Sequence, residues 1–397
     1  MKKKIILKQN NIHLLFKTLI YITFLVVCFN FYEAVNSNKG WQYTDWLINY
    51  QGGFTRRGLA GELILRFSLL TKIHFNLLLL FIVFSLYFIF YKELLLIIKE
   101  TKIKLIDLFI LLSPLSFFYP VMESKISGRK EIIFFVLLIL LFKNINKIAF
   151  SFQKYLILMF TIIAFLVHSG FILYSPYFIV VFLLANHKKN IKKLGRELIL
   201  MFLLISLSIL TIFFSFTKEV DITLLCEPIK QFYINCGNLD YISTLNWSFE
   251  YQLSRREMRN NLDSFNLFYF IAFLYAFIPI IFLFKKSKFE INKNIKFNSI
   301  YIILIPFIST LPIYYIAGDW GRYLFLSYIS SLLIYLFCRK LNIVKFNFSI
   351  DFLKKKNNLY LIVLIFLYSF VLTIPHCCNN NFKFIYQKPI SNILNKI

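Results

Sequence analysis

The sequence predicts an all-α, polytopic transmembrane helical bundle, and three observations lead to this fold class. Hydrophobic residues fill 59% of the 397 positions. The mean hydropathy of +0.68 is higher than a soluble core with a polar surface would give. Many apolar segments approach the roughly 20 residues that a bilayer span needs, and Lys-rich or Asn-rich stretches separate them. We therefore expect residues 1–397 to form a single integral membrane domain.

Eleven apolar segments are predicted to cross the membrane. The first has a basic start like that of a signal peptide. It lacks a small-residue cleavage site and further spans follow it, so we expect a retained helix. The spans are predicted near residues 13–33, 74–91, 105–121, 132–142, 155–167, 171–186, 197–216, 264–284, 299–317, 323–338 and 359–375.

The charges of the loops predict the topology. With the Lys2–Lys4 end inside, the cytoplasmic segments hold about 28 of the 45 Lys and Arg residues and about 6 of the 19 acids. This sorting favours a cytoplasmic N-terminus and a C-terminus on the other side, with outer loops at 34–73 and 217–263. The formal charge of +26 then follows from the positive-inside rule, and no nucleic-acid partner is expected.

Arginine is distributed differently from lysine. Most lysines are predicted to face inward. Arginine is a planar, permanently charged fork that suits phosphate or carboxylate oxygens, so the outer face looks suited to holding an anion. Ordinary ion pairs with the outer acids are the alternative. The arginines predicted to face outward are Arg56, Arg57, Arg66, Arg129, Arg255, Arg256, Arg259 and Arg322.

The first outer loop contains DWLINYQGGFTRRGLAGELILRF, from Asp45 to Phe67. Glycines release the backbone just before Arg56 and Arg57, and an amphipathic helix that can lie along the interface begins directly after them. An arginine pair at a helix start, where free backbone N–H groups also point outward, could cradle a diphosphate. Arginines that snorkel to lipid head groups are the alternative.

The second outer loop, ESKISGRKE from Glu123 to Glu131, places charges at the mouth of the next span. Such charges are unfavourable in an apolar protein unless they are paired or used. Glu131 fits a cap that matches the helix dipole, whereas Arg129 is harder to explain without a function.

The chain turns at HSG, from His168 to Gly170, between two predicted spans. A histidine there can act as a base near neutral pH or hydrogen-bond at the interface. The five histidines are scattered, with none at metal-ligand spacing from another, so no metal site is expected.

The long outer loop, 217–263, combines aromatic residues with the arginines of SRREMRNN, Ser254 to Asn261. Such rings can stack on sugar faces, and they equally suit the membrane interface. Cys226 and Cys236 lie ten positions apart in this loop, and a disulfide between them is plausible in an oxidising compartment.

The motif AGDWGRY, from Ala317 to Tyr323, places Asp319 and Arg322 three residues apart. In a helix this spacing lets the two side chains pair. In an open turn the motif would present a carboxylate and a guanidinium to the same pocket.

Together these features resemble the Wzy-type O-antigen or capsular polysaccharide polymerases, integral membrane glycosyltransferases that are compared with the GT-C class. The resemblance rests on GGFTRRG, GRKE, HSG, the Arg-rich long loop and GDWGR, in a many-span chain rich in Ile, Phe, Lys and Asn. The resemblance extends over the whole chain in the arrangement of its spans and loops. The family is usually described with two large outer loops of similar size, whereas here only one is long.

The resemblance implies a GT-C-like fold in a bacterial inner (plasma) membrane. It also implies a reaction that moves a growing glycan from undecaprenyl diphosphate onto another lipid-linked repeat. Cations would stabilise the departing diphosphate, and a carboxylate or imidazole would take the acceptor proton. We expect Arg56, Arg57, Arg129 and Arg322 around the diphosphate and Asp319 or His168 as the base, with Glu62 and Asp45 as weaker candidates.

The expected partners are the undecaprenyl diphosphate-linked oligosaccharide, membrane lipids and, optionally, a chain-length regulator protein, and no cofactor is expected. Three other classes stay open. A different GT-C transferase for undecaprenyl-linked sugars would differ only in its product, and a flippase would need cations at mid-membrane depth. An outer-face acyltransferase would want an acid beside His168.

Overall fold

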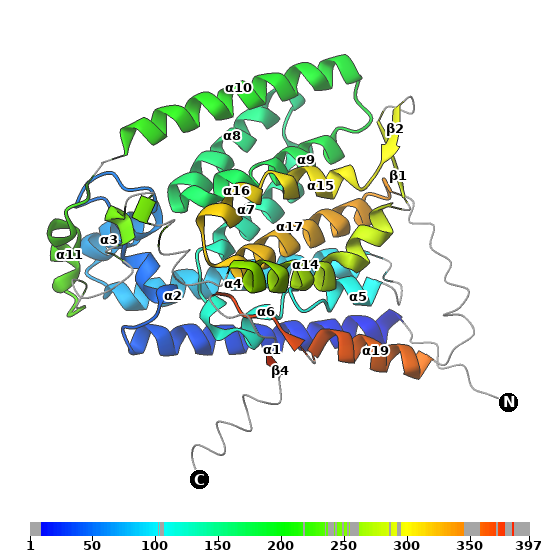
Figure 1. The fold of residues 1–397 in the computed structure, drawn as a ribbon. Helices are drawn as coiled ribbons and strands as arrows, with labels where there is room; N and C mark the ends of the chain where they lie inside the picture. Colours follow the sequence, from blue (N-terminus) through cyan, green and yellow to red (C-terminus); the bar gives the residue numbers. More distant parts are fainter. Residues whose placement is uncertain are drawn as a thin grey trace, which may run out of the picture.

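A computed structural model shows the chain as a bundle of helices (Figure 1). It describes residues 9–344, 358–370, 372–377 and 383–384, except 102, 104–106, 217–218, 235, 237–241, 243, 248–249, 252–253, 255–261, 286 and 292–294. The structure is 77% helical with almost no strand. This confirms the all-α prediction.

The helices follow the apolar segments of the sequence closely. In chain order they are α1 (Gln9–Asn36), α2 (Trp41–Thr44), η1 (Asp45–Leu47), α3 (Leu59–Thr71), α4 (Phe75–Glu100), α5 (Asp107–Leu111), α6 (Tyr119–Met122), η2 (Ser124–Ile126), α7 (Glu131–Asn144), η3 (Ile145–Lys147), α8 (Phe150–Val167), η4 (Ser169–Tyr174), α9 (Pro176–Ala185), α10 (Ile191–Ser215), α11 (Ile222–Lys230), η5 (Thr244–Asn246), α14 (Leu262–Lys285), α15 (Tyr301–Ile308), α16 (Leu311–Ile316), α17 (Trp320–Lys340) and α19 (Asn358–Phe370).

Two short antiparallel hairpins complete the described structure. Strand β1 (Lys288–Ile291) pairs with β2 (Ile295–Asn298), with Phe289 opposite Phe297. Strand β3 (Leu372–Thr373) pairs with β4 (Lys383–Phe384).

Six helices in the described part of the chain are long and apolar enough to cross a membrane, namely α1, α4, α8, α10, α14 and α17. The membrane prediction is therefore supported for these segments. Other predicted spans are shorter as helices: α7 has 14 residues, and the apolar helical stretches 169–185 and 301–316 also fall below the length of the six. The total of about eleven spans and the GT-C-like arrangement stay predictions.

Polar and apolar side chains are distributed across the bundle as expected for a protein surrounded by lipid. Helix α17 is buried along its whole apolar length and carries Ser327, Ser330 and Ser331 inside the protein. Helix α10 is the most apolar of the six and only 11% of its apolar window is buried; its Phe202 and Phe214 are exposed. Lipid tails solvate apolar side chains, whereas small and hydroxyl residues suit helix contacts inside a membrane bundle.

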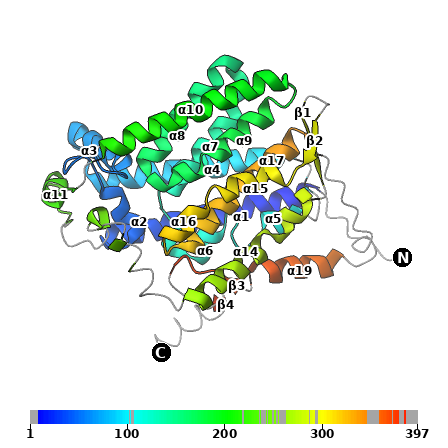
Figure 2. The same cartoon turned by 45° about the horizontal axis from the view of Figure 1, so that its top comes forward.

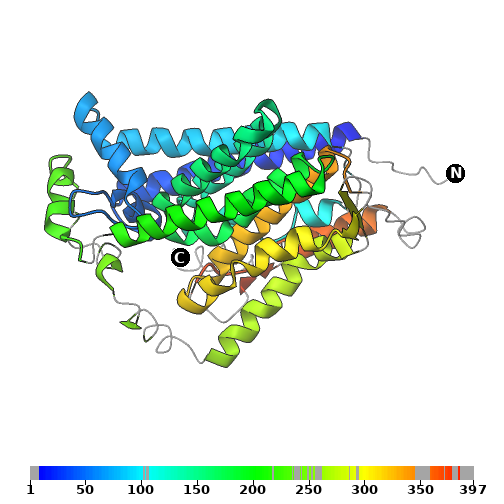
Figure 3. The ribbon, with the colours of Figure 1, turned by 90° about the horizontal axis from the view of Figure 1, so that it is seen from above.

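The helices lie roughly along one direction, with α17 inside. Helix α10 lies on one side of the bundle and α19 on the opposite side (Figure 2), and α4 and α14 lie at opposite edges when the bundle is seen from above (Figure 3). Helices α2, α3 and α11 gather at one end, which we call the outer end, and the β1–β2 hairpin lies at the other, the inner end (Figure 1).

The predicted span at 105–121 is broken into α5 and α6, with a turn that contains Pro114 between them. Proline cannot continue a helix ladder, so backbone carbonyls near the break need other donors. The Tyr328 hydroxyl donates to the Ile110 carbonyl (2.7 Å), and the Tyr91 hydroxyl donates to the Phe117 carbonyl (3.1 Å). Tyrosines of neighbouring helices therefore take over the role of the missing ladder.

Candidate active site

A cluster of buried charges lies at the outer end of the bundle. It comprises Asp45, Arg129, Lys130, Glu131 and Arg322, each at most 2% exposed. They come from η1, the turn before α7, α7 itself and the first turn of α17. Buried ions are strongly unfavourable unless they are paired and hydrogen-bonded, so the contacts of this buried charge cluster decide what it can do.

Arg322 pairs with two carboxylates. Its Nε donates to Glu131, and its Nη1 lies 3.5 Å from Oδ2 of Asp319. The backbone N–H of Arg322 donates to the carbonyl of His376 at 3.1 Å, which satisfies one of the free donors at the start of α17. Of the two alternatives for GDWGR, the pairing of Asp319 with Arg322 is present, and a second pair with Glu131 joins it.

Lys130 is completely buried at the centre of the cluster. Its ammonium donates to the carbonyl of Arg57 at 2.9 Å and lies 3.6 Å from Oδ1 of Asp45. It also lies 5.8 Å from the ring centroid of Trp46. Burial lowers the pKa of Lys130 to about 8, with Asp45 acting against that shift and the nearby Arg57 and Arg322 adding to it.

The turn that precedes α7 has a backbone that only glycine adopts easily. Gly128 has φ of +79°, and a Cβ there would lie 1.9 Å from the ring of Phe31. The Gly128 carbonyl accepts from Trp46 Nε1 at 2.7 Å, and its N–H donates to the Tyr87 hydroxyl at 3.1 Å. This anchored turn directs the successive Arg129, Lys130 and Glu131 side chains to different partners.

The arginine pair of the first outer loop lies beside the cluster and half-buried. Arg56 Nη2 donates to the carbonyl of Thr244 at 3.3 Å. The carbonyl of Arg57 is the acceptor for Lys130. As predicted, an amphipathic helix, α3, begins just after the pair.

The carboxylate of Glu62, a candidate catalytic residue, accepts hydrogen bonds that hold this loop in place. Its carboxylate accepts from the backbone N–H of Tyr50 (2.9 Å), from Gln51 Nε2 and from Arg66 Nε (2.6 Å). Partial burial raises its pKa, and these hydrogen bonds outweigh that effect, so the pKa lies below its usual value. Glu62 thus fits a role in loop structure better than one in proton transfer.

His168 is buried between α8 and η4. Its Nδ1 accepts from the N–H of Gly170 at 3.1 Å, so the neutral ring carries its proton on Nε2. Burial keeps the pKa of His168 well below its usual value, and the surrounding cations, chiefly Arg57 and Arg322, lower it further. The imidazole is therefore neutral, and its Nε2–H is suited to donate a hydrogen bond.

A pocket of about 570 Å³ adjoins the buried charge cluster. We call it the outer pocket. Arg129 and the partly exposed Asp319 both line it, and Arg129 Nε is held by the carbonyl of Lys125 at 3.0 Å. Its wall also contains His376, which lies 3.5 Å from Glu123. The described residues that line it are Gly40, Trp41, Gln42, Lys125, Arg129, Asp319, His376 and Cys377.

The structure therefore divides the predicted site residues into three groups. Arg129 and Asp319 line the outer pocket. Four others are not among the residues that line the pocket and lie near Lys130, namely Arg56, Arg57, Arg322 and His168. Glu62 is held apart by its loop contacts.

Other predicted features have separate outcomes. The arginines at 255, 256 and 259 lie outside the described residues. Cys226 and Cys236 form a disulfide with a Cα–Cα distance of 5.5 Å, which staples α11 to the segment after it. Among the described residues no group of three or more His, Cys, Asp or Glu side chains could hold a metal ion.

Sequence reasoning did not assign roles to Lys130, Tyr87 or Trp46, which hold the cluster together. The signal for Lys130 was its position between Arg129 and Glu131 at a span mouth.

No protein-family model matches the chain, no curated protein is detectably similar to it in sequence, and no solved structure matches its fold.

Proposed function

We propose that this chain is a membrane glycosyltransferase that polymerises undecaprenyl diphosphate-linked oligosaccharide repeats into O-antigen or capsular polysaccharide at the periplasmic face. One observation carries the proposal: a guanidinium and a carboxylate, Arg129 and Asp319, line the same pocket at one end of a lipid-solvated bundle. Transfer from a diphosphate carrier needs both kinds of group.

The cations support the part of the mechanism in which the diphosphate leaves. As the bond from the anomeric carbon to the diphosphate breaks, negative charge develops on the leaving group. Arg129 lines the pocket, and Arg322 and Lys130 lie buried behind it, where a low dielectric strengthens their effect. Fixed cations can thus stabilise this charge without a metal ion.

The hydrogen-bond pattern favours Asp319 over His168 as the base. Asp319 is partly exposed to the outer pocket and paired with Arg322, an arrangement that holds a carboxylate ready to accept the proton of an acceptor hydroxyl. His168 presents a protonated Nε2, so it is better suited to donate to a substrate oxygen or an anion.

A flippase for the same lipid-linked repeat fits less well. Transport needs cations along a passage through the bundle, whereas Arg129 precedes α7 and Arg322 lies in the first turn of α17. Both are at helix ends, on the same side of the bundle. A different transferase for undecaprenyl-linked sugars would use the same groups, and its product would distinguish it.

The test is surface polysaccharide length in a strain that lacks the gene and is complemented with variants. Asp319→Asn keeps the size of the side chain and removes the base, so we expect at least about 100-fold less polymer and an accumulation of one-repeat glycans. Glu227→Gln, which removes an exposed carboxylate of α11 at the same end, is the matched control and should make normal chains.

The deletion strain and three arginine variants separate the remaining classes. One-repeat glycans in the deletion strain would support a polymerase, whereas the absence of any repeat would point to an earlier step or to flipping. Arg57→Gln, Arg129→Gln and Arg322→Gln should each shorten the chains when the variants are compared with the parent at equal protein abundance. Normal long chains from all three would contradict the proposal.

A further inference from the structure

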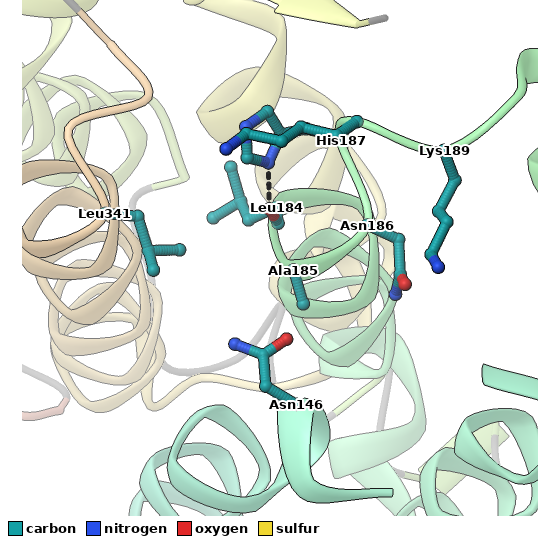
Figure 4. Close-up of a pocket in the computed structure, with 8 residues that line it drawn as sticks. Asn146, Leu184, Ala185, Asn186, His187, Lys189 and Leu341 are labelled. Carbon is teal, nitrogen blue, oxygen red and sulfur yellow. Dashed lines mark hydrogen bonds between the residues drawn. The ribbon is translucent and has the colours of Figure 1, made fainter. Parts of the chain in front are cut away.

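A second polar pocket, drawn in Figure 4, lies at the inner end of the bundle, where α9 and α17 end and α10 begins (Figure 1). We call it the inner pocket. Its volume is about 240 Å³, and it forms where the α9–α10 loop meets η3 and the end of α17. The described residues that line it are Asn146, Leu184, Ala185, Asn186, His187, Lys188, Lys189 and Leu341.

The floor of the inner pocket is built by hydrogen bonds. The amide of the buried Asn186 donates to Gln153 Oε1 (2.6 Å) and to the Phe182 carbonyl (2.9 Å). In Figure 4, Leu341 faces Leu184 and Ala185 across the pocket. The loop is therefore fixed to α8 and α9.

His187 presents one ring nitrogen with a defined role. The Leu184 carbonyl can only accept, so the hydrogen bond of 2.9 Å to it requires the proton on Nδ1 of His187 (Figure 4). In the neutral ring Nε2 is then a hydrogen-bond acceptor, which suits a hydroxyl group of a bound ligand.

Lys188 and Lys189, like Lys192 and Lys193 of the next turn, differ from three paired cations at the inner end. Lys143, Lys340 and Arg339 pair with Glu93, Glu100 and Asp107 at 2.6, 2.6 and 2.9 Å. In the part of the chain that the structure describes, neither Lys188 nor Lys189 has a carboxylate within ion-pair distance; Lys189 lies 5.7 Å from the ring centroid of Phe150. The inner pocket thus gathers positive charge that the described carboxylates do not neutralise.

We propose that the inner pocket binds a phosphate oxyanion through Lys188 and Lys189. Its volume suits a phosphate with a small head group rather than an oligosaccharide. The phosphate could belong to an anionic lipid or be free in solution. Because the loop joins the ends of two apolar helices, the pocket lies at a depth where lipid phosphates are available.

The experiment measures thermal unfolding of the purified full-length chain in neutral detergent. Phosphatidylglycerol, phosphatidylcholine and inorganic phosphate are titrated separately, and each shift of the midpoint gives an apparent Kd. The double variant Lys188→Gln/Lys189→Gln should bind phosphatidylglycerol about 25-fold more weakly, since each direct contact between a lysine and the phosphate contributes about a factor of five.

The matched control is Lys192→Gln/Lys193→Gln, which removes the same charge from the next turn without touching the pocket lining. It should change the apparent Kd less than threefold. Stabilisation by phosphatidylglycerol alone identifies a lipid head group, and equal stabilisation by inorganic phosphate identifies free phosphate; both support the site. The proposal would be overturned if the two double variants lost the same affinity for phosphatidylglycerol. It would also be overturned if neither phosphatidylglycerol nor inorganic phosphate stabilised the parent protein more than phosphatidylcholine does.

Discussion

Buried ion pairs matter more for the stability of this protein than exposed ones do. The side chain of Arg322 is 3% exposed and pairs with a Glu131 side chain that is 2% exposed. Arg66 forms a similar pair with Glu62, but 66% of its side chain is exposed. Exposed pairs contribute little because water and salt screen them, whereas removing one partner of a buried pair leaves a charge that nothing else neutralises.

Lys130 should give the protein an unusual alkaline pH dependence. Its pKa is about 8 in the folded protein against an ordinary value of 10.5. Between these values the unfolded chain binds a proton that the folded chain has released, so the contribution of Lys130 to stability rises with pH across this window. The expected gain between pH 8 and 10.5 is about 3 kcal/mol at most.

The measurement is the free energy of unfolding in mixed detergent micelles from pH 7 to 10.5. Lys130→Met should flatten the rise, because the titrating group is gone. Lys125→Met, which removes an exposed lysine from the same turn, should leave the rise intact. If the stability difference between the parent protein and Lys130→Met did not change over this window, Lys130 would not be buried as a cation.

At the scale of elements, the turns that carry the site depend on single glycines. Gly128 combines a left-handed φ with contact to Phe31, so Gly128→Ala should destabilise the protein by about 1–3 kcal/mol. A methyl group added at Gly195 in α10 would meet nothing within 4 Å, so Gly195→Ala should be neutral or stabilise by up to about 1 kcal/mol.

Thermal unfolding midpoints of the two alanine variants test this difference. The variants add the same methyl group, so a difference between them reports the backbone and the space around it. Equal midpoints would mean that the turn before α7 relaxes freely and does not fix the directions of Arg129, Lys130 and Glu131.

The elements also show which parts of the site were predictable from the sequence. The pairing of Asp319 with Arg322 follows from a spacing of three residues, and α3 follows from its amphipathic pattern. The pair between Arg322 and Glu131 joins residues 191 positions apart, and Lys130 reaches a carbonyl 73 positions away. Residue spacing in the sequence carries no information on such distant partners. For Glu131 it therefore indicates only a cap that matches the helix dipole.

The break between α5 and α6 could not be predicted for the same reason. Hydropathy treats 105–121 as one apolar stretch, and the tyrosine hydroxyls that satisfy its broken backbone come from α4 and α17. Long apolar helices were therefore predictable, whereas interrupted ones depend on contacts from elsewhere in the bundle.

For the whole molecule, the charge sorting predicts that the two ends of the bundle face opposite compartments. Cation-rich loops such as that of Lys188 should be cytoplasmic, and the loop of Lys39, whose neighbour Gly40 lines the outer pocket, should face outward. Both positions are exposed, so cysteines introduced there should react freely with a polar reagent. On intact cells a membrane-impermeant maleimide should label Lys39→Cys and should label Lys188→Cys only after the membrane is opened.

The native cysteines leave this measurement clear, because Cys226 and Cys236 are joined in a disulfide and Cys338 is buried. The unsubstituted protein gives the background from the other native cysteines, Cys28, Cys377 and Cys378. If both introduced cysteines reacted on intact cells, the two ends would share a compartment and the positive-inside argument would fail. The outer pocket would then lose its periplasmic substrate, whereas phosphate binding by the inner pocket, which depends on local charge, could still be measured in detergent.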